Sequence, residues 1–298
     1  MIYTGDNFLS VVVVTHNCGR FLGEFFGSWA RTVEACAALR GGRPRVIVVD
    51  SGSTDDTVSR IRELMGEGEV MTLGNVGYGA AANAGMAAAR SPWVLLCNAD
   101  LSFAADFATR LVEGVWGAEK GELAGAAVIG PKLLEEDGTL QPSVGLFPTV
   151  GRLLRDQMRP RSQRKYVRHP PMKAGQVEWV SGACLLLRRE AIKKVGGFDE
   201  KYFLYVEEVD LQYRLRQAGE QVWYLPEATV RHLQPNAKRP PRREMQRYAA
   251  RGLLRFFAQH GTGGQLLSYR VLASLSGRIA WREAWRKRAE IIARATGP

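Results

Sequence analysis

Long uncharged hydrophobic runs are missing from this sequence of 298 residues. No stretch approaches the roughly 18–20 apolar residues that a membrane-spanning helix needs. The first ten residues, MIYTGDNFLS, have neither the basic nor the apolar segment of a secretory signal peptide. We therefore expect a cytoplasmic protein.

Cysteine is scarce as well, with only Cys18, Cys36, Cys97 and Cys184, which lie far apart and form no CxxC pair. In a chain of this length the pattern predicts reduced, buried thiols and excludes a disulfide framework or a zinc ribbon. The composition, 46% hydrophobic and 24% charged, is that of a globular protein with a sizeable core.

Positive charge is abundant but unevenly placed. The chain carries a formal charge of +11, of which residues 231–298 contribute +12 and residues 152–173 contribute +7, so the remainder is acidic. Such asymmetry indicates an anionic partner, although a solvated basic surface is the simpler alternative. Aromatic residues interleave with the C-terminal cations, a pattern typical of helices at a membrane surface. We expect an anionic membrane surface as partner, and no nucleic acid.

Three hydrophobic runs, 9–15, 46–50 and 93–98, the first two rich in β-branched residues, predict strands buried on both faces. Helical spacing follows the second run up to residue 65, and the Ala-rich segment 78–90 predicts another helix. This β-α-β-α-β order favours a parallel sheet, whose ligands bind beyond the carboxyl ends of the strands.

From about residue 128 a second segment begins. Residues 128–134, 180–187 and 227–231 predict strands, whereas 190–195 and 206–218 predict helices. The Pro- and Arg-rich residues 148–176 predict a mobile loop near a substrate site. Beyond residue 242 the pattern is helical, with a break at 261–264.

Oxygen-bearing side chains stand at the predicted strand ends. Asp50 can accept hydrogen bonds from a nucleotide base or ribose, or cap the following helix. Asn98 and Asp100 offer oxygen donors of the kind that Mg²⁺ or Mn²⁺ binds together with substrate phosphates. The nearby GYGAAA at 77–82 is close to a dinucleotide fingerprint. However, it follows an apparent third strand, and the acid at the expected distance, Asp100, belongs to the turn after residues 93–98.

Three acids open the predicted helix at 206–218. Glu207 and Glu208 flank its apolar stripe, where a carboxylate can act as a general base. Alternatively, these acids complement the helix dipole, and Asp210 pairs with Arg214. His232, at the end of a strand, completes a metal site opened by Asp100 or is a structural histidine.

Taken in order, these segments resemble the inverting GT-A glycosyltransferases of the glycosyltransferase 2 family, and in particular bacterial rhamnosyltransferases. The resemblance covers residues 10–232. It is carried by VVVVTHN (11–17), VVDSGSTDDT (48–57), NVGYGAAANAG (75–85), LCNAD (96–100), WVSGACLLL (179–187), GGFDEKYFLYVEEVDL (196–211) and the 226–232 segment.

The resemblance implies a GT-A α/β fold, with a mostly parallel sheet flanked by helices. Residues 1–232 would be the catalytic domain, divided into a nucleotide-sugar half (1–127) and an acceptor half (128–232). Residues 233–298 would form a helical basic extension that associates with the inner face of the cell membrane.

The resemblance also implies roles for individual residues. Glu208 would be the general base, with Glu207 as the alternative, and Asp100 with His232 would hold Mg²⁺ or Mn²⁺. Gly182, Ala183 and Asp210 would border the acceptor. The nucleotide sugar would bind Thr15, Asn17, Asp50, Gly52, Asn75, Gly77, Asn83, Asn98 and Asp100. Two departures stand out: Asn98 occupies the first acidic position of the DxD motif, and Glu208 follows Glu207 where many members have Glu-Asp.

The expected reaction moves a sugar, L-rhamnose from dTDP-rhamnose, onto a hydroxyl of a lipid-linked or cell-surface glycan, with inversion and metal assistance. A UDP-sugar donor is the alternative within the family. Outside it, the alternatives are a sugar-1-phosphate nucleotidyltransferase and a non-catalytic protein that binds anionic lipid or nucleic acid. The nucleotidyltransferase would need a Gly-rich basic loop after the first strand, where this chain has Thr-His-Asn-Cys-Gly-Arg.

Overall fold

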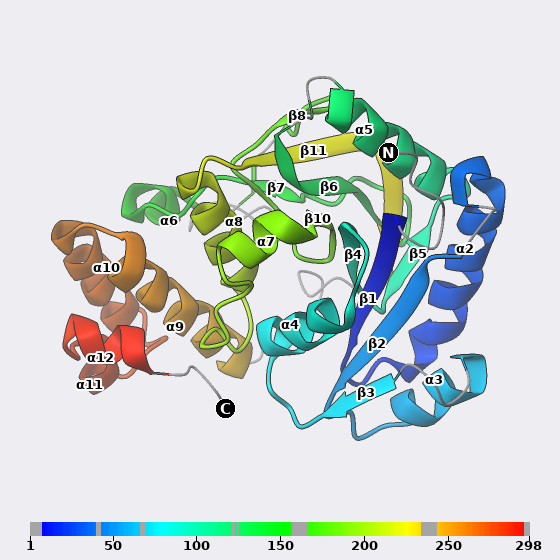
Figure 1. Cartoon of the computed structure of the whole chain (residues 1–298). Coiled ribbons are helices and arrows are strands. Elements are labelled where there is room, and N and C mark those ends of the chain that lie inside the picture. The colour runs from blue at the N-terminus through cyan, green and yellow to red at the C-terminus, as the bar shows by residue number, and fades with distance from the viewer. Residues whose placement is uncertain are drawn as a thin grey trace.

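A computed structural model describes residues 8–39, 43–65, 70–120, 123, 125–156, 166–167, 169–233 and 243–294. Its centre is a mixed sheet with the strand order β3-β2-β1-β4-β10-β6-β11-β5 (Figure 1). The first four strands in this order are parallel. They are β1 (Leu9–Thr15), β2 (Arg45–Ser51), β3 (Val70–Leu73) and β4 (Trp93–Asn98).

The second half of the sheet begins where β10 (Cys184–Arg188) inserts antiparallel between β4 and β6 (Ala126–Glu135). The long strand β11 (Gln221–His232) then runs parallel to β6, with register shifts near Leu225. Short strands β5 (Leu101–Phe103) and β8 (Gly175–Gln176) pair antiparallel with β11. A separate pair joins β7 (Val144–Gly145) to β9 (Trp179–Val180).

Helices cover both faces of the sheet, and β1 shows why its sequence is continuously hydrophobic. Val11 and Val13 pack in one core cluster with α2 (Leu22–Ala35) and α5 (Phe107–Lys120). Val12 and Val14 point to the other face, toward α4 (Tyr78–Ala88), α7 (Arg189–Lys194) and α8 (Glu207–Gln217). Because successive strand side chains alternate, a strand buried on both faces needs apolar residues throughout. Helix α3 (Thr57–Met65) and the short 3-10 helices η1 (Gly19–Phe21) and η2 (Ala37–Leu39) complete this part.

The C-terminal helices form a second cluster beside the sheet (Figure 1, orange to red). They are α9 (Arg243–His260), α10 (Gly263–Leu275), α11 (Trp281–Ala284) and α12 (Arg288–Ala293), and α6 (Val150–Asp156) packs with them. Helix α10 begins at a capping box formed by Thr262 and Gln265. Phe256 of α9 packs with Val206 and Val209, so this cluster lies directly against α8.

Most predicted elements are confirmed, although no prediction covered α2, α5 or the short strands β5, β7 and β8. Strand β3 was expected only as an apparent third strand before Gly77, without bounds, because its four residues are too few to show a clear pattern. The strand expected at 180–187 is interrupted at residues 181–183, where a turn carries Gly182. Residues 150–156, expected in a loop, form α6, whose helical periodicity is masked by exposed leucine and arginine side chains. Residues 157–165 and 168 of that expected loop lie outside the described residues.

The cysteine prediction is confirmed: Cys18, Cys36, Cys97 and Cys184 are all buried free thiols. No helix within the described ranges is both long and apolar enough to cross a bilayer.

Candidate active site

The carboxyl ends of β1 and β2 meet around Asp50, which is 2% exposed. Its Oδ1 accepts a hydrogen bond from Thr15 Oγ1 at 2.9 Å, and its Oδ2 accepts one from the Ser53 amide at 2.9 Å. The carboxylate therefore fixes the loop after β2. It does not cap the following helix, because α3 (Thr57–Met65) begins further on and the Thr57 amide donates to Asp55 Oδ1 at 3.0 Å. A contact of Asp50 with a nucleotide stays a prediction.

The adjacent loop is organised by Asn17, an exposed residue with a left-handed φ of 51°. Its Oδ1 accepts hydrogen bonds from the amides of Thr54 at 2.8 Å and Asp55 at 3.3 Å. Gly52 has a φ of +72°, and a Cβ there would lie 2.7 Å from the Asn75 amide nitrogen. Glycine is thus required at residue 52 for the loop to approach Asn75. The loops that follow β1 and β2 therefore form a polar surface at the carboxyl ends of these strands.

Asp100 and His232 are brought together from distant parts of the chain. His232 Nε2 lies 3.1 Å from Asp100 Oδ1, and His232 Nδ1 lies 3.2 Å from Gln141 Oε1. When Nδ1 donates to Gln141, the Nε2 lone pair of a neutral imidazole faces the Asp100 carboxylate. That contact becomes attractive when the ring carries a second proton or when a cation is shared between the two groups.

These donors fit the predicted divalent metal. Within the described ranges, no group of three or more His, Cys, Asp or Glu side chains is arranged to hold a metal ion. A metal at Asp100 and His232 would therefore take its remaining ligands from water and a diphosphate, which is how Mg²⁺ commonly binds. Gln141 supplies the outer hydrogen bond that orients a histidine ligand.

The predicted base candidates open α8 in an unusual backbone setting. Glu207 and Glu208 are 5% and 6% exposed, and both line the same cavity as His232. The two preceding residues, Tyr205 and Val206, have left-handed φ values of 69° and 74°. This conformation is costly for a β-branched residue and is found mainly at functional sites.

Two side chains that the sequence did not single out hold the turn opposite these glutamates. Gln212 Oε1 accepts the Val180 amide at 2.8 Å, while its Nε2 donates to the Val180 carbonyl at 2.8 Å. Tyr78 Oη donates to the Gly182 carbonyl at 2.9 Å. Burial and the nearby Glu207 raise the pKa of Tyr78 well above its ordinary value, so its hydroxyl stays protonated. The only sequence signal for Gln212 is its place four residues after Glu208.

Gly182 is positioned for close packing against a glutamate. A Cβ at Gly182 would lie 3.2 Å from Glu208 Cβ. On the other side of α8, a Cβ at Gly79 would lie 3.8 Å from Glu207 Cβ. The two glutamates therefore face different neighbours: Glu208 the predicted acceptor turn at Gly182 and Ala183, and Glu207 the first turn of α4.

Two predicted contact residues are engaged elsewhere. Asn83 Nδ2 donates to the Phe198 carbonyl at 2.9 Å and its Oδ1 accepts the Phe198 amide at 2.9 Å. Gly77, with φ +86°, would place a Cβ 2.3 Å from the Phe203 carbonyl oxygen. Both residues thus join α4 to the 196–203 loop, and the amide of Asn83 is used within the protein.

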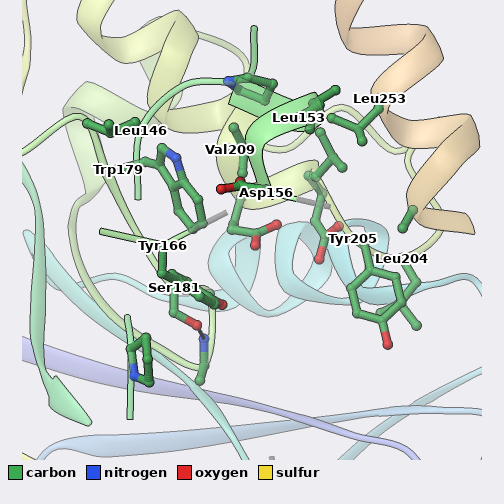
Figure 2. Close-up of a pocket in the computed structure, with 18 of the residues that line it drawn as sticks. Leu146, Leu153, Asp156, Tyr166, Trp179, Ser181, Leu204, Tyr205, Val209 and Leu253 are labelled. Carbon is green, nitrogen blue, oxygen red and sulfur yellow. Dashed lines mark hydrogen bonds between the residues drawn. The ribbon is translucent and has the colours of Figure 1, made fainter. Parts of the chain in front are cut away.

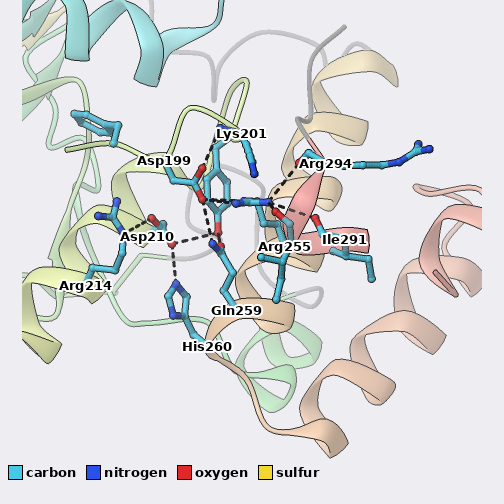
Figure 3. Close-up of polar contacts among 12 residues, drawn as sticks. Asp199, Lys201, Asp210, Arg214, Arg255, Gln259, His260, Ile291 and Arg294 are labelled. Carbon is cyan, nitrogen blue, oxygen red and sulfur yellow. Dashed lines mark hydrogen bonds and ion pairs between the residues drawn. The ribbon is translucent and has the colours of Figure 1, made fainter. Parts of the chain in front are cut away.

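Asp210 does not line the cavity, so the expectation that it borders the acceptor does not fit this geometry. Its carboxylate is fully buried and accepts from Arg214 Nε at 2.8 Å and Tyr202 Oη at 3.3 Å, with His260 Nε2 at 2.7 Å. Figure 3 shows this cluster beside a second one, in which Arg255 contacts Asp199. Asp210 therefore ties α9 to α8, and the predicted Asp210–Arg214 pair is present.

One cavity of about 940 Å³ extends from Glu207, Glu208 and His232 to the C-terminal helices (Figure 2). Its polar end includes Asn98, Gln141, Gly182, Ala183, Glu207, Glu208 and His232. Its other end lies among α6, α9 and α10. Thr15, Asn17, Asp50, Gly52 and Asn75 lie outside its lining, at the strand ends described above.

Sequence comparison identifies relatives of this chain. The family described as Glycosyl transferase family 2 matches residues 10–196. The chain is 34% identical over 247 residues to the N-acetylglucosaminyl-diphospho-decaprenol L-rhamnosyltransferase of Mycobacterium tuberculosis, a match that spans 75% of each protein. A shorter match, 42% identical over 50 residues and covering 17% of this chain and 19% of the relative, is to the rhamnosyltransferase WbbL of Escherichia coli.

Solved structures share the fold at low sequence identity. The mannosyltransferase PcManGT from Pyrobaculum calidifontis, in complex with GDP-Man and Mn²⁺, has a TM-score of 0.54 at 17% identity, covering 97% of this chain and 79% of that one. TarS 1-349 from S. aureus, in complex with UDP, has a TM-score of 0.52 at 16% identity, with coverages of 96% and 83%. These similarities confirm the predicted α/β fold with its helical C-terminal region.

Proposed function

We propose a specific reaction for this chain, which belongs to glycosyl transferase family 2 and is a glycosyltransferase: L-rhamnose passes from dTDP-rhamnose to a hydroxyl of a polyprenyl-linked glycan, with inversion. The observation that carries the proposal is the cavity in which Glu208 and His232 converge. The mycobacterial relative supports the choice of sugar and acceptor, since both stand in its name.

Asp100 and His232 would hold Mg²⁺ or Mn²⁺. Bound there, the cation would neutralise the negative charge of a nucleoside diphosphate leaving group. Thr15, Asn17, Asp50, Gly52, Asn75 and Asn98 lie at the edge at which the nucleotide sugar would bind, where the parallel strands end. In this arrangement the nucleotide lies over residues 1–127 and the acceptor over 128–232.

Glu208 would act as the base. Its carboxylate takes the proton from the acceptor hydroxyl, whose oxygen forms a bond to the anomeric carbon of the donor. The bond from that carbon to the diphosphate oxygen breaks, and dTDP leaves from the opposite face. Glu208 is favoured over Glu207 because it packs against Gly182, whereas Glu207 faces Gly79.

The C-terminal helices would bring the enzyme to the cytoplasmic face of the membrane. Leu267, Val271 and Leu275 stand at helical spacing on α10 and are 51%, 41% and 81% exposed. Trp281, 62% exposed, follows on α11. An apolar stripe with flanking cations suits the headgroup region of an anionic membrane.

Replacement of Glu208 by glutamine tests its role. We expect Glu208→Gln to lower turnover by about two to four orders of magnitude, because a proton acceptor is lost while the shape is kept. Binding of dTDP with Mn²⁺, measured by thermal shift, should be unchanged. Glu207→Gln is the matched control, and it should retain substantial turnover. If the two variants exchange these behaviours, Glu207 is the base; if both turn over normally, neither is.

A nucleotide panel tests the donor. We expect dTDP, but not GDP or NAD⁺, to raise the unfolding midpoint by about 2 °C or more in the presence of Mn²⁺ or Mg²⁺. A preference for UDP would favour the second candidate, a UDP-sugar donor, which is supported by the UDP bound to the TarS structure. A folded protein that responds to no nucleotide would contradict the proposed reaction.

A further inference from the structure

The cavity changes character along its length. Near Glu208 and His232 its walls are polar, whereas the far end is largely aliphatic. Figure 2 shows Leu153, Leu204 and Leu253 around this end, with Leu146 beyond Trp179. Further apolar lining comes from Pro148, Val206, Val209, Met245, Ala249 and Ala250. Such a wall can remove the apolar surface of an aliphatic chain from water.

Cations accompany this apolar wall. Arg152 and Arg155 of α6 and Arg278 line the cavity, and Asp156 lies next to Arg155 in the same lining. Arg152 is already engaged, because its Nη1 donates to the Phe147 carbonyl at 2.8 Å and lies 3.2 Å from Glu178. Arg155 is exposed, and no ion pair joins it to another residue in the described ranges. A guanidinium so placed can bind a phosphate oxygen pair.

The apolar end also lies next to exposed apolar side chains. On α6, Leu153 lines the cavity while its neighbour Leu154 is 51% exposed. On α10, Tyr269 lines the cavity while Leu267 and Val271 are exposed. Because α6 and α10 contact each other, the same helices carry the cavity wall on one side and an apolar outer surface on the other.

From this juxtaposition we infer a subsite for the lipid part of the acceptor, formed by α6 and α9. The first isoprene units would lie against Leu146, Leu153 and Leu253, and the diphosphate would contact Arg155. The sugar would then extend toward Glu208, and the rest of the prenyl chain would leave past α6 and α10 into the membrane. This inference rests on the proposed function for the identity of its occupant.

Binding of farnesyl diphosphate and of inorganic diphosphate, measured by calorimetry on the full chain with dTDP and Mn²⁺ present, tests the subsite without turnover. The wild type should bind farnesyl diphosphate at least about tenfold more tightly, because the isoprene units bury apolar surface. Leu146→Gln and Leu253→Gln should each remove about tenfold of that preference and leave diphosphate binding unchanged. Leu64→Gln, which changes an exposed α3 side chain outside the cavity lining, is the control.

Arg155→Gln should weaken the binding of both farnesyl diphosphate and inorganic diphosphate. Arg62→Gln, which removes an exposed arginine from α3, should weaken the binding of neither. Leu146 is 38% exposed, so its replacement is compatible with folding, and unfolding midpoints check every variant. Equal binding of the two ligands by the wild type, or unchanged binding by both leucine variants, would overturn the subsite.

Turnover separates this inference from the proposed function. If Leu253→Gln raises the KM for a long-chain polyprenyl acceptor about tenfold but leaves the KM for a short-chain analogue unchanged, the subsite is supported. If both acceptors react normally in the variant, the proposed transferase reaction is supported and the lipid subsite is ruled out. Tight farnesyl diphosphate binding without any glycosyl transfer would discard the reaction and retain the lipid site.

Discussion

Two aspartates connect the C-terminal helices to the rest of the protein through individual side chains. Asp199 Oδ2 accepts from Arg255 Nη2 at 2.6 Å, from Arg255 Nε at 3.0 Å and from Gln259 Nε2 at 3.1 Å (Figure 3). Arg255 is only 3% exposed, so its buried positive charge needs the negative charge of Asp199 to compensate it. Asp210 makes the corresponding connection from α8 to His260. The cost of losing either carboxylate is therefore that of an unpaired buried group.

Asp199→Asn should show this cost and its pH dependence. Burial raises the pKa of Asp199, but hydrogen bonds from Arg255 and the Lys201 amide outweigh it, so the pKa lies below its ordinary value of 3.8. The ionised carboxylate thus stabilises the fold at neutral pH, and this stability disappears as the pH falls through the folded-state pKa. We expect Asp199→Asn to lose about 3–5 kcal/mol at pH 7 and progressively less in acid.

Urea unfolding between pH 7 and pH 3 measures this difference. Glu190→Gln is the control, because Glu190 also has a lowered pKa, caused by Lys193, but lies on the surface. It should leave stability almost unchanged. A loss in Asp199→Asn that is the same at every pH would show that the ionised carboxylate is not its source.

At the scale of elements, the start of α8 depends on how closely α9 approaches it. The left-handed residues Tyr205 and Val206 lie directly before the catalytic candidates Glu207 and Glu208. On α9, a Cβ at Gly252 would lie 2.8 Å from the Tyr205 carbonyl oxygen and 3.0 Å from Val206 Cγ2. Gly252 thus allows the helix to pack against the strained turn and hold it in place.

Gly252→Val should disturb this contact. We expect a loss of about 1–3 kcal/mol in stability, because the added side chain overpacks the interface. Turnover should fall while dTDP binding is retained, since the glutamates move and the strand-end loops do not. Gly23→Ala, at an exposed position of α2 with no atom within 4 Å of the new Cβ, is the matched control and should be neutral or stabilising. Wild-type turnover in Gly252→Val would contradict the dependence of Glu207 and Glu208 on the close approach of α9.

At the scale of the whole molecule, the basic C-terminal region completes the enzyme. Its helices share a core of their own, centred on Leu254, Phe257 and Tyr269, and also line the cavity. Deleting them would uncover Val206 and Val209 and would remove the Arg255 partner of Asp199 and the His260 partner of Asp210. Membrane association is therefore tested by changing only the exposed face.

The combined change Leu267→Gln, Val271→Gln and Leu275→Gln should weaken binding to phosphatidylcholine vesicles that contain phosphatidylglycerol by at least about tenfold. All three side chains are exposed, so folding should be unaffected. Co-sedimentation measures the bound fraction, with Leu64→Gln as control and pure phosphatidylcholine vesicles as the uncharged reference. Undiminished binding would rule out α10 as the membrane-facing helix.

Local sequence patterns determined the elements around the site. Continuous hydrophobic runs predicted β1, β2 and β4, because strands buried on both faces need apolar residues at nearly every position. Oxygen-bearing side chains at the strand ends predicted a ligand site at the carboxyl edge of the sheet, because parallel strands end at one edge. The ordered motifs led to the family, which the comparisons confirm, whereas the roles of Glu208 and Asp100 stay predictions.

Other features were decided by the tertiary structure, because they depend on residues far apart in the chain. Asp100 meets His232, and Tyr78 meets Gly182, only after the sheet has formed. Asp210 shares the helix of the glutamates, yet its place on the turn directs it to His260 and away from the cavity. The charge pattern of the C-terminal region predicted helices on a membrane but not their second role. That α9 packs on α8 and lines the cavity follows from contacts between distant residues, which no local periodicity encodes.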